Sequence, residues 1–401
     1  MRATTDADAE AWVLTSDQGL ALLAEASAVA APRPADLTRW RRLATADQVA
    51  GAVRLAESRR RGAAKFTRAD RMWFEPTGLE QATAEAVARH KAARFAGNGA
   101  AVVDLCCGIG GDTLALAESV GSGALAVDLD PGMLRRAAWN ARAYGVGDRV
   151  LPVRARAQTF ALPSGSWAHI DPDRRARGSR SSRARNVSDY QPGPEWLLNL
   201  SRTVPGGAIK LGPGSDFADH FGGTEFEVEV VSLNGECKEA TVWFGGAATV
   251  TRRSTKLPQG VTWTDRDGPR GLAPIGAVSA WVFDPDPSLT RAGLFDGFAT
   301  AHGLTRVASD IDLLTGRHSG VSPFLTPFEV IAVLPLDFKR LKREIVARRL
   351  GTLEIKTKGI DLRPEDVRAR LKPEGEIPAT LILIGGRGPG RAIIAQRVAT
   401  R

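Results

Sequence analysis

The residues best suited to chemistry lie where a short apolar run meets a glycine-rich turn. The run 100–105 carries Asp104 near its end, and the turn that follows contains Cys106, Gly108 and Gly110. Glycine lets the backbone turn tightly and approach a ligand closely. The order of elements is strand, loop and helix. Alone, such a turn is consistent with any dinucleotide-binding fold.

A second carboxylate makes this turn more informative. The next expected strand, 124–127, runs into Asp128 and Leu129, about two dozen residues after Asp104. A carboxylate at that place can accept hydrogen bonds from both ribose hydroxyls of a nucleoside. The third glycine of G-x-G-x-x-G would fall on Thr113, which argues against a nicotinamide site. Capping of the two strand ends is the structural alternative for both carboxylates.

In these segments the chain resembles the class I S-adenosylmethionine-dependent methyltransferases. Their first motif is an acidic residue followed by x-G-x-G, and their second is the acidic end of strand two. The resemblance implies S-adenosyl-L-methionine as the cofactor, with its methionine end near the first turn. The cofactor-binding positions that it implies are Asp104, Cys106, Gly108, Gly110, Asp128 and Leu129.

A third element, Asp171-Pro172, follows the expected strand 169–170. Members of this family that methylate planar amines carry Asp or Asn, two Pro and an aromatic residue here. The resemblance implies that the Asp171 side chain and the Pro172 carbonyl hold the target N–H groups in line with the sulfonium methyl. Transfer is a substitution at carbon, so positioning contributes more than acid–base catalysis. The fourth position is Arg174 instead of an aromatic residue, and a turn-forming Asp-Pro is the structural alternative.

Six arginines lie within the twelve residues 174–185. Because Ser and Gly separate them, we expect a loop over the mouth of the site. Arg174, Arg175 and Arg177 are candidates to grip the phosphates of a nucleic-acid substrate. A solvated loop is the alternative. Another basic residue, Arg156, stands where many family members have an acidic residue that contacts adenine.

The net charge of the 401-residue chain is +9, and it is concentrated near one end. Residues 338–401 contain 16 Lys and Arg against 7 Asp and Glu, which accounts for the whole excess. Three Cys and five His exclude a disulfide framework and a four-cysteine zinc site, and we expect no metal. No apolar run is long enough to span a bilayer, and acidic residues precede the stretch 19–31, so we expect a cytoplasmic protein.

Further segments are similar to a bacterial group described as methyltransferases with a THUMP-like C-terminal domain. They include Leu-Glu-Gln-Ala at 79–82 and the segments 171–175, 189–192, 210–214, 235–239, 283–287 and 353–356. THUMP domains bind RNA, so the resemblance implies an RNA partner by analogy of fold. Candidate phosphate contacts in the basic terminus are Lys342, Arg343 and Lys356. A solvated helix face is the alternative.

The expected fold class is α/β, with a Rossmann-like methyltransferase core between N-terminal helices and small C-terminal α+β modules. We expect four parts: a helical region (1–97), the S-adenosylmethionine-binding domain (98–250), a middle α+β module (277–337) and a basic THUMP-like domain (338–401). Residues 245–276 are expected to be a connection.

These patterns predict an S-adenosylmethionine-dependent methyltransferase that acts on a base in structured RNA, with Asp171 and Pro172 as the catalytic positions. One alternative is a methyltransferase of a protein or a small molecule. Another is a core that has lost its activity and remains an RNA-binding module.

Overall fold

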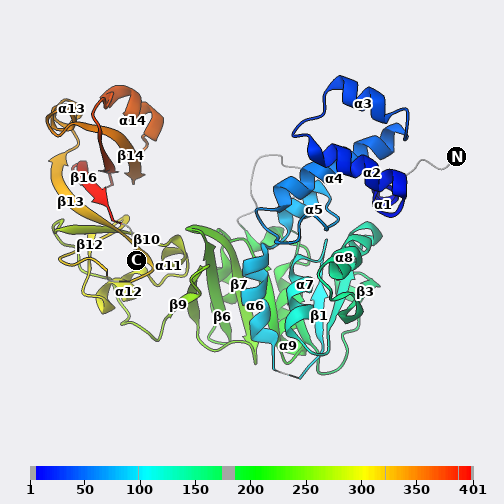
Figure 1. Ribbon diagram of the computed structural model, residues 1–401. Coiled ribbons are helices and arrows are strands. Elements are labelled where there is room, and N and C mark those ends of the chain that lie inside the picture. Colours follow the sequence, from blue (N-terminus) through cyan, green and yellow to red (C-terminus); the bar gives the residue numbers. More distant parts are fainter. Residues whose placement is uncertain (1–5, 98, 174–185, 321, 387, 399–401) are drawn as a thin grey trace. The chain divides into compact units, whose positions relative to one another are not determined.

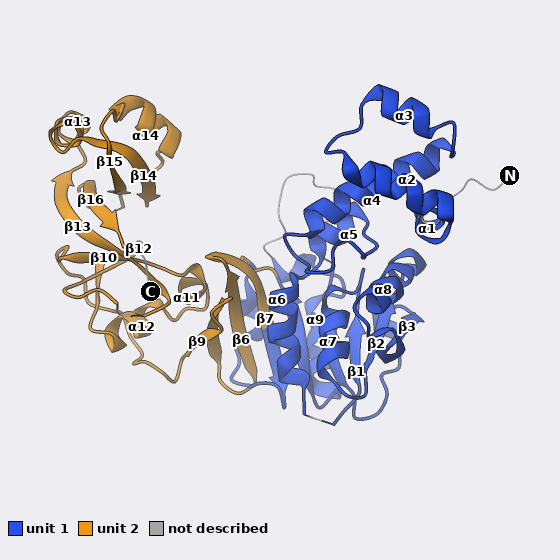
Figure 2. Ribbon diagram, in the orientation of Figure 1, with its two compact units in different colours: residues 1–211, 215–225, 242–248 blue, residues 212–214, 226–241, 249–401 orange. Residues whose placement is uncertain are grey.

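A computed structural model describes residues 6–97, 99–173, 186–320, 322–386 and 388–398 (Figure 1). The chain divides into two compact units (Figure 2). Unit 1 comprises residues 1–211, 215–225 and 242–248, and unit 2 comprises residues 212–214, 226–241 and 249–401.

The N-terminal part of unit 1 is helical, as the sequence predicts. Its helices are α1 (Asp6–Thr15), α2 (Asp17–Ala28), α3 (Pro34–Trp40), α4 (Ala46–Gly62), α5 (Pro76–Gln81) and α6 (Glu85–Ala92). Thr45 and Gln48 form a capping box at the start of α4. The last part of this helical region is divided into α5 and α6, because the chain leaves helical geometry at Ala82. The Lys65 ammonium donates to three carbonyls at this break, those of Leu79, Glu80 and Ala82.

The core of unit 1 is the parallel part of a nine-stranded sheet with the order β3-β2-β1-β4-β5-β7-β6-β8-β9. The strands are β1 (Val102–Leu105), β2 (Ala124–Asp128), β3 (Val150–Arg154), β4 (Trp167–Ile170), β5 (Gly206–Leu211), β6 (Phe226–Leu233), β7 (Glu236–Gly245), β8 (Arg252–Leu257) and β9 (Val261–Thr264). Strands β1 to β5 pair in parallel. The helices between them are α7 (Gly111–Ser119), α8 (Pro131–Ala143) and α9 (Pro194–Thr203), with α10 (Phe217–Phe221) after β5. The α/β fold class is therefore confirmed.

One segment of this sheet differs from the expectation. Strands β8 and β9 occupy part of 245–276, where a connection was expected. Polar residues fill much of both strands, so the segment lacks the apolar run of a buried strand. Thr255 nevertheless lies inside, where its hydroxyl bonds a carboxylate oxygen of Glu229. Asn234 and Gly235, which form the turn between β6 and β7, both have positive φ, as tight hairpin turns require.

Unit 2 also contains a seven-stranded sheet with the order β11-β12-β10-β13-β16-β15-β14. Its strands are β10 (Trp281–Pro285), β11 (Thr305–Ala308), β12 (Ile311–Gly316), β13 (Leu325–Pro335), β14 (Leu350–Lys358), β15 (Ile377–Ile384) and β16 (Arg391–Arg397). Its helices are α11 (Pro287–Arg291), α12 (Phe295–Ala301), α13 (Phe338–Ala347) and α14 (Pro364–Leu371).

The boundary expected between residues 337 and 338 falls inside this sheet. Strand β13 pairs with β10 on one side and with β16 on the other. Val282 and Ile393, from opposite sides of the expected boundary, lie in one hydrophobic cluster. The two predicted modules therefore share a sheet and a core. In the part of the chain that the structure describes, no helix is long and apolar enough to cross a membrane.

Candidate active site

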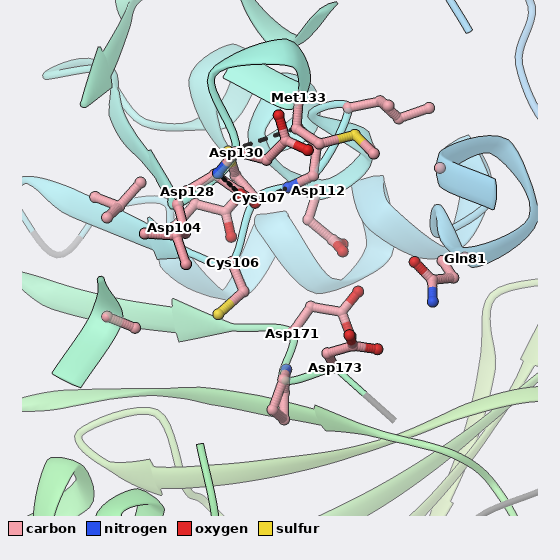
Figure 3. A pocket seen from close by; sticks show the side chains of 18 of the residues that line it. Gln81, Asp104, Cys106, Cys107, Asp112, Asp128, Asp130, Met133, Asp171 and Asp173 are labelled. Atoms are coloured by element: carbon pink, nitrogen blue, oxygen red, sulfur yellow. Dashed lines mark hydrogen bonds between the residues drawn. The ribbon is translucent and has the colours of Figure 1, made fainter. Parts of the chain in front are cut away.

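A cavity of about 640 Å³ lies in unit 1 at the carboxyl ends of β1, β2 and β4 (Figure 3). Small-molecule sites commonly have volumes of this order. Its wall is formed by residues from six segments, which are 78–83, 104–112, 127–133, 155–158, 171–173 and 191–192. The first segment belongs to the N-terminal helical part, so the cavity is not built by the sheet alone.

The glycine-rich turn adopts a backbone conformation that favours glycine. Gly108 has φ +55° and Gly110, the N-cap of α7, has φ +89°. A Cβ at Gly110 would lie 3.3 Å from Ala137 of α8, whereas a Cβ at Gly108 would meet nothing within 4 Å. The turn therefore packs against α8 on one side and leaves open space for a ligand on the other.

Asp128, at the end of β2, holds this turn in place. Its Oδ2 accepts a hydrogen bond from the Gly108 N–H at 2.9 Å, and its Oδ1 accepts one from the Asp130 N–H at 2.9 Å. Burial raises the pKa of the Asp128 carboxyl, although these two N–H donors oppose the shift. A carboxylate has about four acceptor positions, so Asp128 can accept further hydrogen bonds. The neighbouring Leu129 borders the cavity with an exposed apolar side chain.

Asp104, near the end of β1, borders the cavity and is almost fully buried. Its Oδ1 lies 2.7 Å from His169 Nδ1, and its Oδ2 accepts a hydrogen bond from the Thr113 hydroxyl. Asp104 and His169 are register partners on the adjacent strands β1 and β4. The Asp104 carboxylate therefore connects the end of β1 to β4 and to the start of α7.

A second buried carboxylate, Asp112, joins α7 to the N-terminal part. Its Oδ1 lies 3.0 Å from Lys91 Nζ of α6, and its Oδ2 accepts a hydrogen bond from the Thr83 hydroxyl at 2.7 Å. Burial alone would raise the pKa of Asp112, but the charge of Lys91 holds that pKa well below its ordinary value. Thr83 is thereby locked in the wall of the cavity.

Asp171 follows β4 and forms an ion pair with Lys210 of β5. The Lys210 ammonium lies 2.6 Å from Asp171 Oδ2 and also donates to the Gln81 carbonyl at 3.3 Å. Burial raises the pKa of the Asp171 carboxyl, and the charge of Lys210 opposes that rise. Pro172 and Asp173 also border the cavity, and Asp173 exchanges two backbone hydrogen bonds with Gln191.

The structure brings most of the predicted cofactor and catalytic residues to this cavity. Bordering it are Asp104, Cys106, Gly108, Asp128, Leu129, Asp171 and Pro172, while Gly110 caps α7 beside it. Arg156 borders it too. Burial raises the pKa of the Cys106 thiol well above its ordinary value, so this cysteine is not a thiolate nucleophile at neutral pH.

The structure does not place the predicted substrate-binding residues that it describes at this cavity. Arg174, Arg175 and Arg177 lie outside the described residues. Lys342 and Arg343 are exposed on α13. Lys356 is instead half-buried on β14, with its ammonium 2.8 Å from Asp284 Oδ2. This ion pair neutralises the charge that was expected to contact phosphate.

Sequence reasoning missed several residues of the site, notably Gln81, Thr83, His169 and Lys210. Lys210 and His169 are polar residues within short, fully buried strands, and that placement is a signal that could have found them. Gln81 lies in the segment 79–82 that resembles the bacterial group, whereas Thr83 carries no comparable signal.

Comparisons with known proteins agree with this geometry. A methyltransferase-domain family matches residues 102–170, and a THUMP domain-like family matches residues 325–397. Two relatives from Mycobacterium tuberculosis (strains CDC 1551 / Oshkosh and ATCC 25618 / H37Rv) are described as uncharacterized S-adenosylmethionine-dependent methyltransferases. Each is 35% identical over 322 residues, which is 77% of this chain and 84% of the relative.

A solved structure shares the fold across nearly the whole chain. It is that of a candidate methyltransferase from Porphyromonas gingivalis W83, with a TM-score of 0.75 and 20% identity. The match covers 95% of this chain and 98% of that one. The resemblance inferred from the motifs is confirmed, and with it S-adenosylmethionine as the cofactor. The chain belongs to the S-adenosylmethionine-dependent methyltransferases.

Proposed function

We propose that this methyltransferase modifies a base of a structured RNA, holding the target amine with Asp171 and the Pro172 carbonyl. The observation that carries the choice of RNA is the match of residues 325–397 to the THUMP domain-like family. THUMP domains bind RNA, and α13 begins with the exposed cations Lys339, Arg340, Lys342 and Arg343. Among the described residues, none of these four forms an ion pair within 4 Å.

The cavity fits the cofactor, since open space lies beside Gly108 and two further acceptor sites remain on Asp128. We assign the ribose to Asp128, the adenine to the apolar side of Leu129, and the methionine end to the turn 106–110. S-adenosylmethionine supplies, when bound, a methyl group on an electrophilic sulfonium. The protein's own task is to hold an amine nitrogen in line with that methyl, which the Asp171 carboxylate and Pro172 carbonyl do by accepting its N–H groups.

The decisive experiment incubates total cellular RNA with the full-length protein and methyl-labelled S-adenosylmethionine, followed by nucleoside analysis. We expect label in one methylated base. Label in protein or small-molecule fractions, with none in RNA, would assign the enzyme to another substrate class. Absence of label in all fractions, together with binding of S-adenosylhomocysteine, would point to an RNA-binding module without activity.

Replacing Asp128 by Asn is expected to weaken binding of S-adenosylhomocysteine by about tenfold to a hundredfold. The reason is that hydrogen bonds to a charged acceptor contribute about 1.5–3 kcal/mol each. Calorimetric titration measures the affinity. Asp148→Asn is the matched control, because Asp148 is exposed on the surface before β3 and does not border the cavity. Equal affinities for the two variants would contradict the assignment of Asp128.

The double variant Lys342→Gln/Arg343→Gln is expected to bind the labelled RNA more weakly and with less dependence on salt. Each lost phosphate contact should lower the slope of log affinity against log salt by about 0.7–0.9. Binding measured from low to high salt gives this slope. Lys356→Gln is the comparison variant, and it should leave the slope unchanged because Lys356 is paired with Asp284. A slope unaffected by the double variant would remove α13 from the RNA interface.

A further inference from the structure

Lys210 is a buried cation that none of the sequence motifs explains. Its side chain is 5% exposed and emerges from β5, where every residue is buried. Within the described residues its ammonium has two hydrogen-bond partners, Asp171 Oδ2 at 2.6 Å and the Gln81 carbonyl at 3.3 Å. We propose that Lys210 is a positioning residue that fixes the Asp171 carboxylate for the target amine. This inference rests on the proposed function, because it takes Asp171 as the group that holds the target.

The energetics of burial argue against a purely stabilising role. An ammonium loses its hydration when it is buried, and a carboxylate partner repays that cost only in part. An apolar residue at position 210 would suit a fully buried strand better. A buried ion pair at the edge of the cofactor cavity therefore suggests a requirement for a particular orientation of Asp171.

The geometry of the pair supplies that orientation. Lys210 reaches from β5 to the turn after β4 and to the end of α5, so it connects two segments of the cavity wall to the central sheet. Its bond to Oδ2 limits rotation of the Asp171 carboxylate. Oδ1 has no hydrogen-bond partner among the described residues and is left to accept from a ligand. Figure 3 shows the side chains of Gln81, Asp171 and Asp173 around one open space.

The charge of Lys210 also sets the protonation state of Asp171. Burial raises the pKa of Asp171, Lys210 lowers it, and the buried Asp112 of α7 raises it further. Other ionisable groups around this part of the cavity are Lys91 of α6, Asp104 and Cys106 at the end of β1, His169 of β4 and Asp173. Without Lys210, burial and the charge of Asp112 would still raise the pKa of Asp171. Its carboxylate would then take up a proton at higher pH.

The sign of the pH effect follows from this balance. Only the ionised carboxylate accepts N–H groups with both oxygens, so the methylation rate falls as the pH drops through the pKa of Asp171. Removing an adjacent opposite charge raises a carboxyl pKa by about 1–3 units. In Lys210→Met the acidic limb of the rate profile should therefore move to higher pH by about this amount, while Lys210→Arg should keep the limb in place.

The test compares both variants with the wild-type enzyme in the labelled-RNA assay across a pH series. At neutral pH we expect Lys210→Met to lower kcat by about tenfold to a hundredfold, with the KM for S-adenosylmethionine changed by less than about threefold. Lys238→Met is the control, because Lys238 forms a solvent-exposed ion pair with Glu236 at a similar distance, 2.7 Å. An unchanged profile in Lys210→Met would overturn the inference.

Two further measurements separate this inference from structural damage and from the choice of substrate. If Lys210 acts through Asp171, Lys210→Met should change kcat by less than about twofold in an Asp171→Asn background, whereas additive effects would contradict the inference. Carbon-13 NMR titration of labelled aspartate, with the Asp171 signal identified by its loss in Asp171→Asn, reports the pKa without any substrate. If the pKa of Asp171 does not rise in Lys210→Met, the inference is overturned even if RNA is not methylated. A wild-type enzyme that is inactive on RNA would by itself overturn only the proposed function.

Discussion

Asp171→Asn is expected to lower the rate of methyl transfer by about a hundredfold to a thousandfold while leaving the affinity for S-adenosylhomocysteine unchanged. The amide has the shape of the carboxylate but two different ends. The Lys210 ammonium, 2.6 Å from Oδ2 in the wild-type protein, will attract the amide oxygen. The amide NH₂ group is then directed at the target, where it cannot accept the N–H groups of an amine.

Asparagine is a sharper probe than alanine at this position. Alanine would leave the buried Lys210 ammonium without any acceptor at this position, whereas asparagine keeps an amide oxygen there, so alanine would lose more stability and obscure the effect on rate. The labelled-RNA assay gives the rate, and calorimetry with S-adenosylhomocysteine confirms an intact cofactor site. Asp148→Asn, on the exposed surface, should behave as the wild type in both measurements. If Asp171→Asn methylates RNA at the normal rate, Asp171 has no catalytic role.

The parallel core could be predicted because its signals are local. Each strand from β1 to β5 is a short apolar run, and glycine, Asp-Pro or Pro-Gly-Gly follows or precedes it in the sequence. Strands β8, β11, β12 and β16 gave weaker local signals. Thr255 lies in a largely polar strand and Arg391 begins its strand, and their places are set by distant partners, such as the Val307 carbonyl to which Arg391 donates. Pairing between strands far apart in sequence is what joined the two expected C-terminal modules into one sheet.

The glycine-rich turn of the candidate site was predictable to the extent that backbone requirements determine residue type. Gly108 and Gly110 have positive φ, and Asp128 accepts a hydrogen bond from the turn that they form. The residue types of this motif are therefore those that the backbone of the turn requires. The far wall of the cavity could not be predicted in this way. Thr83 reaches the site because its hydroxyl bonds Asp112, which is itself paired with Lys91, and this arrangement depends on how α6 packs against α7.

Glu10→Ala is expected to lower the free energy of unfolding of unit 1 by about 3–5 kcal/mol, the usual cost of breaking a buried ion pair. Glu10 lies on α1 and is 1% exposed. Its Oε2 accepts from the guanidinium of Arg136 on α8 at 2.6 Å and from the Trp73 indole N–H at 2.9 Å. Alanine would leave a buried guanidinium and a buried indole N–H without their acceptor.

A neighbouring ion pair provides the control for this prediction. Asp8 and Arg135 also connect α1 to α8, at 3.1 Å, but both side chains are about half exposed. Asp8→Ala should therefore cost less than about 1 kcal/mol, since exposed pairs contribute little. Chemical denaturation followed by circular dichroism compares the variants. Equal, small losses in both would mean that apolar packing around Trp40 and Leu55 attaches the helices, and that the buried charge of Glu10 is neutral for stability. A large loss of stability confined to Glu10→Ala would show that a polar contact secures α1 on α8. Helix α8 begins directly after the turn Asp128–Asp130, which borders the cavity.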